Sequence, residues 1–168
     1  MKLKRVIIKN YKNLKDVEIN FPDSNIIAFI GNNGSGKSNI LENIAHTFSV
    51  AKDFNNRNDI DYIFDYIYQI DSNEYRIEDD GVRFLYYKNN ARDIKNIGNG
   101  LPKVIFTYYA GETGRLNSYS EYFQKNYDEY LKLKRDDNID LKFVTSFSLK
   151  VFPIAFFANY VFQTAVLD

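Results

Sequence analysis

The N-terminal residues alternate between apolar and polar side chains in two short runs. The runs flank a polar turn at residues 10–13 in "LKRVIIKNYKNLKDVEINF". In the second run Val17, Ile19 and Phe21 are separated by polar residues. A period of two is typical of half-buried strands, and the turn cluster "PDSN" at residues 22–25 ends the second run. The pattern therefore predicts two strands at the start of the chain.

The next apolar segment does not alternate. Residues 26–30, "IIAFI", form a continuous apolar run, which is typical of a strand covered on both faces. Small and polar residues follow, and a helical pattern begins directly after them. Its apolar residues fall on one stripe: Ile40, Leu41, Ile44, Ala45 and Phe48. Residues 1–50 are thus predicted to contain two strands, a buried strand, a loop and a first helix.

The segment 59–92 has a different character. Three short aromatic and β-branched runs, "YIFDYIYQI", "EYRIED" and "VRFLYYKNN", are separated by "DSN" and "DDG". Turn residues between such runs predict an antiparallel β-meander rather than another strand–helix–strand unit. "KVIFTYYA" then predicts one more buried strand, with Pro102 at its entrance.

The last third of the chain gives weaker signals. "SEYFQKNYDEYLKLKR" predicts a helix capped by Ser120, so that residues 101–135 form a strand and a helix. Residues 143–168 begin an apolar segment interrupted by Pro153, Asn159 and Gln163. Its most apolar part, 151–162, is too short to span a bilayer, and we interpret it as buried rather than membrane-bound. We expect one lobe over residues 1–168.

Composition narrows the functional classes. The 168 residues carry 22 basic and 22 acidic side chains, so net charge gives no general attraction to nucleic acid or membrane. The absence of cysteine excludes disulfides, thiolate zinc sites and a cysteine nucleophile. The N-terminus lacks an apolar signal core, and we expect a cytoplasmic protein. His46, the only histidine, is interpreted as a partly exposed helix residue rather than a base or ligand.

The loop before the first helix carries the clearest chemistry. Residues 31–38, "GNNGSGKS", match the phosphate-binding (Walker A) pattern G-x-x-x-x-G-K-[ST] without a mismatch. Glycines let the backbone approach a polyphosphate, and loop amides with the helix N-terminus bind its oxygens. Lys37 supplies a charge for the β- and γ-phosphates, and Ser38 a hydroxyl for Mg²⁺. The predicted ligand is therefore ATP with magnesium, held by Gly31, Asn32, Asn33, Gly34, Ser35, Gly36, Lys37 and Ser38.

These residues resemble a family. "IKNYKNL", "GNNGSGKSN" and "LENI" look like the start of the RecF/SMC-like branch of ABC-type ATPases. More narrowly, they resemble AAA-type ATPases found beside restriction and anti-phage defence systems, a group that "PKVIFTYYAGETGRL" also resembles. The resemblance implies an α/β fold: the N-terminal lobe of a P-loop NTPase, with a mixed sheet around the P-loop helix and an antiparallel β-meander subdomain. It also implies nucleotide contacts by Asn39, Lys12 and Asn13, although an ordinary polar turn equally explains Lys12 and Asn13.

The chain departs from that family in two motifs. A complete ATPase of this kind has an apolar strand ending in Asp-Glu (Walker B), whereas the pair Asp128 and Glu129 lies in a polar helical pattern. The serine-glycine-rich signature that caps the partner's γ-phosphate is also missing, since "AGETG" at residues 110–114 resembles it only superficially. The glutamine that lies near the γ-phosphate has three unconvincing candidates: Gln69, Gln124 and Gln163. We therefore interpret the chain as an N-terminal half that binds ATP without significant turnover.

Several functions share this loop. The first is an ATPase module that dimerises head to tail, or is completed by a C-terminal half, and drives an effector such as a nuclease, or acts on DNA. The second is a non-catalytic module whose binding surface is gated by nucleotide. A small-molecule kinase requires a strand–helix–strand unit after Phe48, and an ABC transporter subunit has different opening strands.

Overall fold

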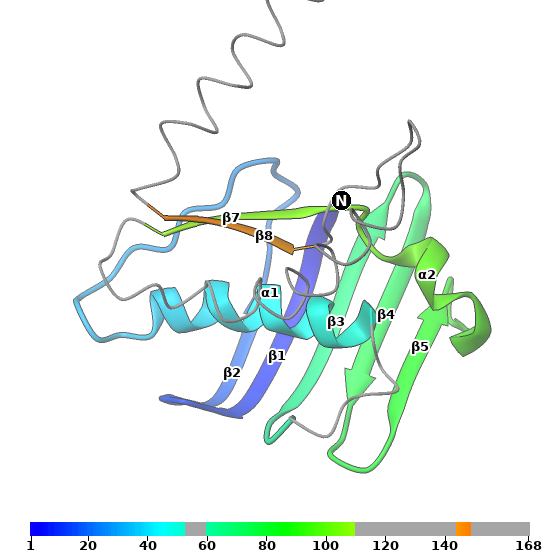
Figure 1. Cartoon of the computed structure of the whole chain (residues 1–168), viewed down its shortest axis with the longest axis horizontal. Coiled ribbons are helices and arrows are strands. Elements are labelled where there is room, and N and C mark those ends of the chain that lie inside the picture. The colour runs from blue at the N-terminus through cyan, green and yellow to red at the C-terminus, as the bar shows by residue number, and fades with distance from the viewer. Residues whose placement is uncertain (53–59, 110–143, 149–168) are drawn as a thin grey trace, which may run out of the picture. The chain divides into compact units, whose positions relative to one another are not determined.

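The computed structural model describes residues 1–52, 60–109 and 144–148, which belong to two compact units divided after Pro102. The first unit contains a six-stranded sheet of order β2-β1-β3-β4-β5-β6 with helix α1 on one face (Figure 1). Its strands are β1 (Lys2–Tyr11), β2 (Leu14–Asn20), β3 (Ile63–Ile70), β4 (Asn73–Asp79), β5 (Phe84–Lys88) and β6 (Ala91–Arg92). Its helices are α1 (Lys37–Lys52), the 3₁₀ turn η2 (Ile94–Asn96) and α2 (Ile97–Gly100).

All neighbouring strands of this sheet run antiparallel. The predicted N-terminal hairpin pairs Val6 with Ile19, and the predicted meander forms β3, β4 and β5. β3 then pairs with β1 on the side opposite β2, placing Tyr66 beside Val6. The prediction of a mixed sheet around the P-loop helix is therefore wrong for this unit, whereas the predicted antiparallel meander is present as part of the same sheet. The free edge of β1 accepts β3, so hairpin and meander become one sheet. In the described residues 60–92, α1 is followed by antiparallel strands and not by the strand–helix–strand unit expected of a kinase.

The core lies between this sheet and α1. Alternate residues of β1 and β3 point to the helix, and Phe48 of α1 meets the rings of Tyr66 and Tyr68 edge-on at 6.0 and 5.1 Å. The fully buried side chains include Val6, Ile8, Phe48, Phe64, Tyr66, Tyr68, Ile77 and Tyr86. The period of two that predicted the strands thus corresponds to one buried and one outward-facing set of side chains.

The buried stripe of α1 differs from the predicted one. Leu41 is 54% exposed, whereas Asn43 and Thr47 are fully buried. Tyrosine hydroxyls explain this difference: Tyr66 donates to Asn43 Oδ1 at 2.5 Å, and Thr47 Oγ1 lies 3.1 Å from the Tyr62 hydroxyl. A buried polar side chain is tolerated when it is hydrogen-bonded, and burial raises the pKa of the Tyr66 hydroxyl, which keeps it a neutral donor.

The predicted buried strand at residues 26–30 is not a strand in the described structure. Ile26 is 84% and Ile30 is 95% exposed. A strand is stabilised by ladder hydrogen bonds to a neighbour, and none of the six strands of the first unit pairs with this segment. It is anchored instead by the Phe29 ring, which meets Phe21 edge-on at 6.2 Å.

Three tyrosines form a ladder beside α2. Tyr68, Tyr75 and Tyr86 come from β3, β4 and β5, and their successive ring centroids are 5.6 and 6.1 Å apart. The Tyr68 hydroxyl donates to the Gly100 carbonyl of α2 at 2.9 Å. α2 and η2, which the sequence patterns did not predict, therefore cover the aromatic end of the sheet.

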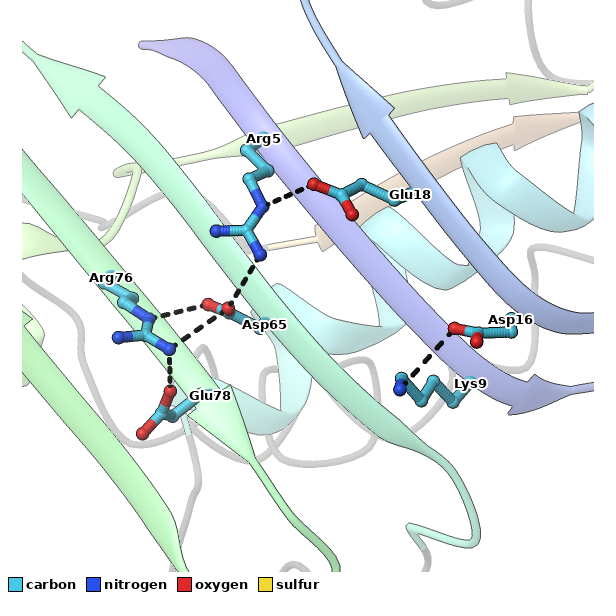
Figure 2. A network of polar contacts seen from close by, with 7 residues as sticks. All are labelled: Arg5, Lys9, Asp16, Glu18, Asp65, Arg76 and Glu78. Atoms are coloured by element: carbon cyan, nitrogen blue, oxygen red, sulfur yellow. Dashed lines mark hydrogen bonds and ion pairs between the residues drawn. The ribbon is translucent and has the colours of Figure 1, made fainter.

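The sheet face away from α1 carries a polar network (Figure 2). Arg76 Nε and Nη2 donate to the two carboxylate oxygens of Asp65 at 2.8 and 3.1 Å, and Arg76 also pairs with Glu78. Arg5 Nε donates to Glu18 at 2.9 Å, and Arg5 Nη2 lies 3.8 Å from Asp65. The hydrogen bond with Asp65 raises the pKa of Arg76. Asp65 thus links β1, β3 and β4.

Replacing Asp65 by alanine should lower the free energy of unfolding by about 1 kcal/mol, because a two-pronged arginine pair with a carboxylate only 15% exposed is lost. Asp16→Ala is the matched control, since its carboxylate is 73% exposed and has one contact of 3.6 Å, with Lys9. Urea unfolding at low and high salt measures both. Equal losses for the two variants would contradict the network's contribution.

The second unit is described only through two strands. β7 (Ile105–Tyr109) confirms the strand predicted in "KVIFTYYA", and it pairs in parallel with β8 (Val144–Ser148), so that Ile105 lies beside Val144. The helix capped by Ser120, the pair Asp128 and Glu129, and the apolar segment after 148 lie outside the described residues. No helix among the described residues is long and apolar enough to cross a membrane. The single lobe over 1–168 stays a prediction.

Candidate nucleotide-binding site

The predicted phosphate loop folds as a tight turn directly before α1. The Ser35 amide donates to the Asn32 carbonyl at 3.2 Å, which closes a four-residue turn. Gly34, the third residue of that turn, has φ +84°, a conformation that side-chain-bearing residues rarely adopt. The loop from Gly31 to Ser35 is exposed and hence accessible to a ligand.

Gly36 is the point at which the loop approaches the sheet. It has φ +97°, and a Cβ placed on it would lie 2.8 Å from Leu14 Cδ2 and 3.2 Å from Asn13 Oδ1. Both its conformation and its close contact with the β1–β2 hairpin therefore require glycine. Gly36 is buried, unlike the rest of the glycines in the motif.

α1 presents its N-terminus to the loop. The amide of Ile40 donates to the Gly36 carbonyl at 2.9 Å and begins the helical hydrogen bonding. The amides of the preceding helical residues have no acceptor within the helix, and the first turn contains no acidic side chain. This end of the helix is therefore positively polarised and suited to an anion.

Lys37 extends back over the loop. Its Nζ donates to the carbonyls of Gly31 and Asn32, both at 2.7 Å, and lies 3.4 Å from Ser35 Oγ. Within the described part of the chain, the recorded contacts of this ammonium group are all with oxygens of the loop itself. The next residue, Ser38, is exposed, and its hydroxyl has no recorded hydrogen bond among the described residues. The first two residues of α1 thus supply an ammonium group and a hydroxyl group.

The tip of the β1–β2 hairpin contacts both the loop and the helix. Asn13 Nδ2 donates to the Gly34 carbonyl at 3.1 Å, and Asn39 Nδ2 donates to Asn13 Oδ1 at 2.6 Å. Lys12 forms an ion pair with Glu42, a carboxylate only 4% exposed. The structure therefore brings Lys12, Asn13 and Asn39 beside the phosphate loop, although their predicted contacts with nucleotide stay a prediction.

Sequence patterns missed Glu42. Its position in "LENI" carries no local signal for a buried carboxylate, and its partner lies 30 residues earlier in the chain. Gln69 lies at the opposite end of the sheet, because it pairs with Lys2 whereas the hairpin tip follows Tyr11. His46 is half-buried and its Nδ1 lies 3.2 Å from the Tyr62 hydroxyl. The described residues contain no cluster of three or more groups suited to a metal ion.

The arrangement matches the requirements of a polyphosphate site. An accessible loop with two glycines of positive φ precedes a helix whose first turn supplies amides, an ammonium group and a hydroxyl. A model of the AAA ATPase domain matches residues 1–157. The chain belongs to this family. This family membership confirms the predicted P-loop ATPase class.

Curated relatives agree with the RecF-like resemblance. The DNA replication and repair protein RecF of Leptospira biflexa is 28% identical over 170 residues, covering 84% of this chain and 46% of the relative. RecF of Streptococcus gordonii is 40% identical over 63 residues, which is 38% of this chain and 17% of the relative. RecF of Bacteroides fragilis is 52% identical over 42 residues, which is 25% of this chain and 11% of the relative. The chain thus spans about half the length of the first of these relatives.

A solved structure reported under "Structural biochemistry of ATP-driven dimerization and DNA stimulated activation of SMC ATPases" also aligns with the chain. The alignment has a TM-score of 0.39 and 22% sequence identity, and it covers 59% of this chain and 76% of the other.

Proposed function

We propose that this AAA ATPase domain chain is the ATP-binding lobe of a RecF-like ATPase and that residues 31–39 hold the β- and γ-phosphates of MgATP. The position of Lys37 carries the proposal. Its ammonium group lies over the loop and contacts the Gly31 and Asn32 carbonyls, oxygens that a phosphate group can replace as acceptors. The polarised start of α1 supports the same placement.

We propose that the Ser38 hydroxyl is a ligand of the magnesium ion. Its hydroxyl is exposed and follows Lys37 directly, so metal and ammonium would act on the same phosphate oxygens. Magnesium, when bound, supplies neutralisation of the phosphate charge. Lys37 and the loop amides hold the same anion in place, while Gly34 and Gly36 allow its close approach.

The test is titration calorimetry of the 168-residue chain with ATP in the presence of magnesium, with ATP in EDTA, and with AMP in the presence of magnesium. We expect binding in the first case and about tenfold weaker binding in the second, since charge neutralisation is lost. AMP should not bind measurably because it lacks the β- and γ-phosphates. The absence of heat and of a thermal shift at millimolar MgATP would overturn the proposal.

The rate of ATP hydrolysis distinguishes an ATPase module from a non-catalytic, nucleotide-gated module. We propose that the chain alone hydrolyses ATP no faster than its Lys37→Ala variant, because its sequence lacks an apolar strand ending in Asp-Glu. Faster hydrolysis would show a catalytic carboxylate within these residues. If a longer chain that spans the full length of the relatives also binds ATP without hydrolysing it, the alternative of a nucleotide-gated, non-catalytic module is favoured.

The remaining functional proposals concern the whole protein. The relatives are named for DNA replication and repair, which supports a role in DNA maintenance. Nucleotide-dependent dimerisation or completion by a C-terminal half, and a cytoplasmic location, rest on the sequence alone. An effector protein such as a nuclease, and an association with anti-phage defence, rest on the sequence resemblance alone. A pull-down with the full-length protein, with and without ATP, tests for the effector.

A further inference from the structure

The side chain of Asn13 joins three elements that are distant in sequence. It lies at the tip of the β1–β2 hairpin, donates through Nδ2 to the Gly34 carbonyl of the loop, and accepts through Oδ1 from Asn39 of α1. One amide group therefore contacts the phosphate loop on one side and the first turn of the helix on the other. Its two contacts use a donor and an acceptor, which only an amide side chain offers at this length.

We propose that Asn13 is a positioning residue that fixes the direction of the Ser35 amide in the phosphate loop. The Gly34–Ser35 peptide is planar, so the Gly34 carbonyl and the Ser35 N–H point in opposite directions. Because Asn13 holds the carbonyl towards the hairpin, the N–H is turned to the other side of the loop. There it donates to the Asn32 carbonyl, which is also an acceptor for Lys37.

That shared acceptor identifies the ligand side of the loop. The Ser35 amide and the Lys37 ammonium group converge on one oxygen, the Asn32 carbonyl, at 3.2 and 2.7 Å. A phosphate oxygen that replaces this carbonyl would receive both donors at once. Asn13 therefore prepares a donor pair for an anion without contacting the anion itself, which lowers the reorganisation that binding requires.

Buried neighbours and an ion pair hold the exposed hairpin tip against α1. Tyr11 and Leu14, on either side of the tip, are buried, and the Tyr11 ring meets Tyr62 edge-on at 4.9 Å. Lys12 has φ +53° and pairs with Glu42, one turn along α1 from Asn39. The loop backbone also lies close to the hairpin at Gly36, where a Cβ would be 2.8 Å from Leu14 Cδ2. The hairpin therefore fixes the position of Asn13, and Asn13 in turn fixes the direction of the Gly34 carbonyl.

Asn13→Ala tests the inference in two ways. The inference rests on the proposed function, and we expect MgATP binding to weaken about five- to tenfold, the loss expected for one to two hydrogen bonds. Without nucleotide, we expect faster amide hydrogen exchange in residues 31–36 and unchanged exchange in β3 and β4. Asn20→Ala is the matched control, because Asn20 is exposed at the end of β2 and has no recorded side-chain hydrogen bond among the described residues.

Asn13→Asp tests the hydrogen bond to Gly34 separately from the hydrogen bond with Asn39. An aspartate still accepts from Asn39 but cannot donate to the Gly34 carbonyl, so loop exchange should rise as in Asn13→Ala. In the Asn39→Ala background, the Asn13→Ala substitution should have less effect than in the wild type, because the two side chains act through one contact.

The outcomes distinguish this inference from the proposed function. Unchanged loop exchange and unchanged affinity in Asn13→Ala would overturn the positioning role. A uniform rise in exchange across β1, β3 and β4 would also overturn it, since Asn13 would then support only the fold. If the wild type does not bind MgATP, the proposed function fails, while the exchange result still decides whether Asn13 orders the loop.

Discussion

Gly100→Ala is expected to lower the free energy of unfolding of the first unit by about 3 kcal/mol. A Cβ at this position would lie 1.8 Å from the Tyr86 hydroxyl oxygen and 2.5 Å from Tyr75 Cε1. The Tyr75 ring is stacked between those of Tyr68 and Tyr86, and the Tyr68 hydroxyl donates to the Gly100 carbonyl. All three rings are buried, so we expect the substitution to displace α2 or disturb the stack.

Gly98→Ala provides the control in the same helix. A Cβ on Gly98 meets no atom within 4 Å, and the residue is helical, so alanine should leave stability unchanged or raise it slightly. Denaturant unfolding followed by tyrosine fluorescence compares the two variants directly. If Gly100→Ala and Gly98→Ala unfold at the same denaturant concentration, the ladder does not depend on the close approach of α2.

Lys37→Ala is expected to weaken MgATP binding at least about 100-fold, because the positive charge that lies over the loop is lost where the ligand carries most negative charge. The fold should be little affected, since Lys37 contacts only loop oxygens in the described structure. Lys37→Arg should recover part of the affinity, because it retains the charge but presents a planar group of different reach. Titration calorimetry and thermal unfolding measure the two effects.

Lys88→Ala is the matched control for Lys37→Ala. Lys88 is exposed at the end of β5, three strands away from β1 in the sheet. Its replacement by alanine removes the same charge from the chain. An equal loss of affinity in both variants would mean that general electrostatic attraction, rather than the position of Lys37, binds the nucleotide.

The antiparallel strands and the first helix could be predicted because each has a local signal. Period-two alternation located β2 and the meander, and helical spacing located α1. The prediction of a strand at residues 26–30 was wrong because an apolar run indicates burial but does not show whether a neighbouring strand is available for pairing. Leu41 was wrongly included in the buried stripe and Asn43 was left out of it, because apolar spacing does not reveal that Tyr66 supplies a partner for a buried amide.

The candidate site was predictable only where its residues are contiguous. The phosphate loop is one unbroken motif, so its spacing identified it. The contacts of Asn13 with Gly34 and of Lys12 with Glu42 span 21 and 30 residues, and they arise only when the hairpin folds against α1. The resemblance pointed to Lys12 and Asn13 as nucleotide ligands, while the structure gives both side chains protein partners.

The network on the outer sheet face limits how a polyanion can approach this lobe. Its two guanidinium groups, Arg5 and Arg76, already share three carboxylates, Glu18, Asp65 and Glu78 (Figure 2). A nucleic-acid backbone laid across these strands would have to displace those carboxylates, and it would release few counterions in exchange. Under the DNA-maintenance role proposed above, a duplex would therefore be expected to lie against another surface and leave this one in solvent.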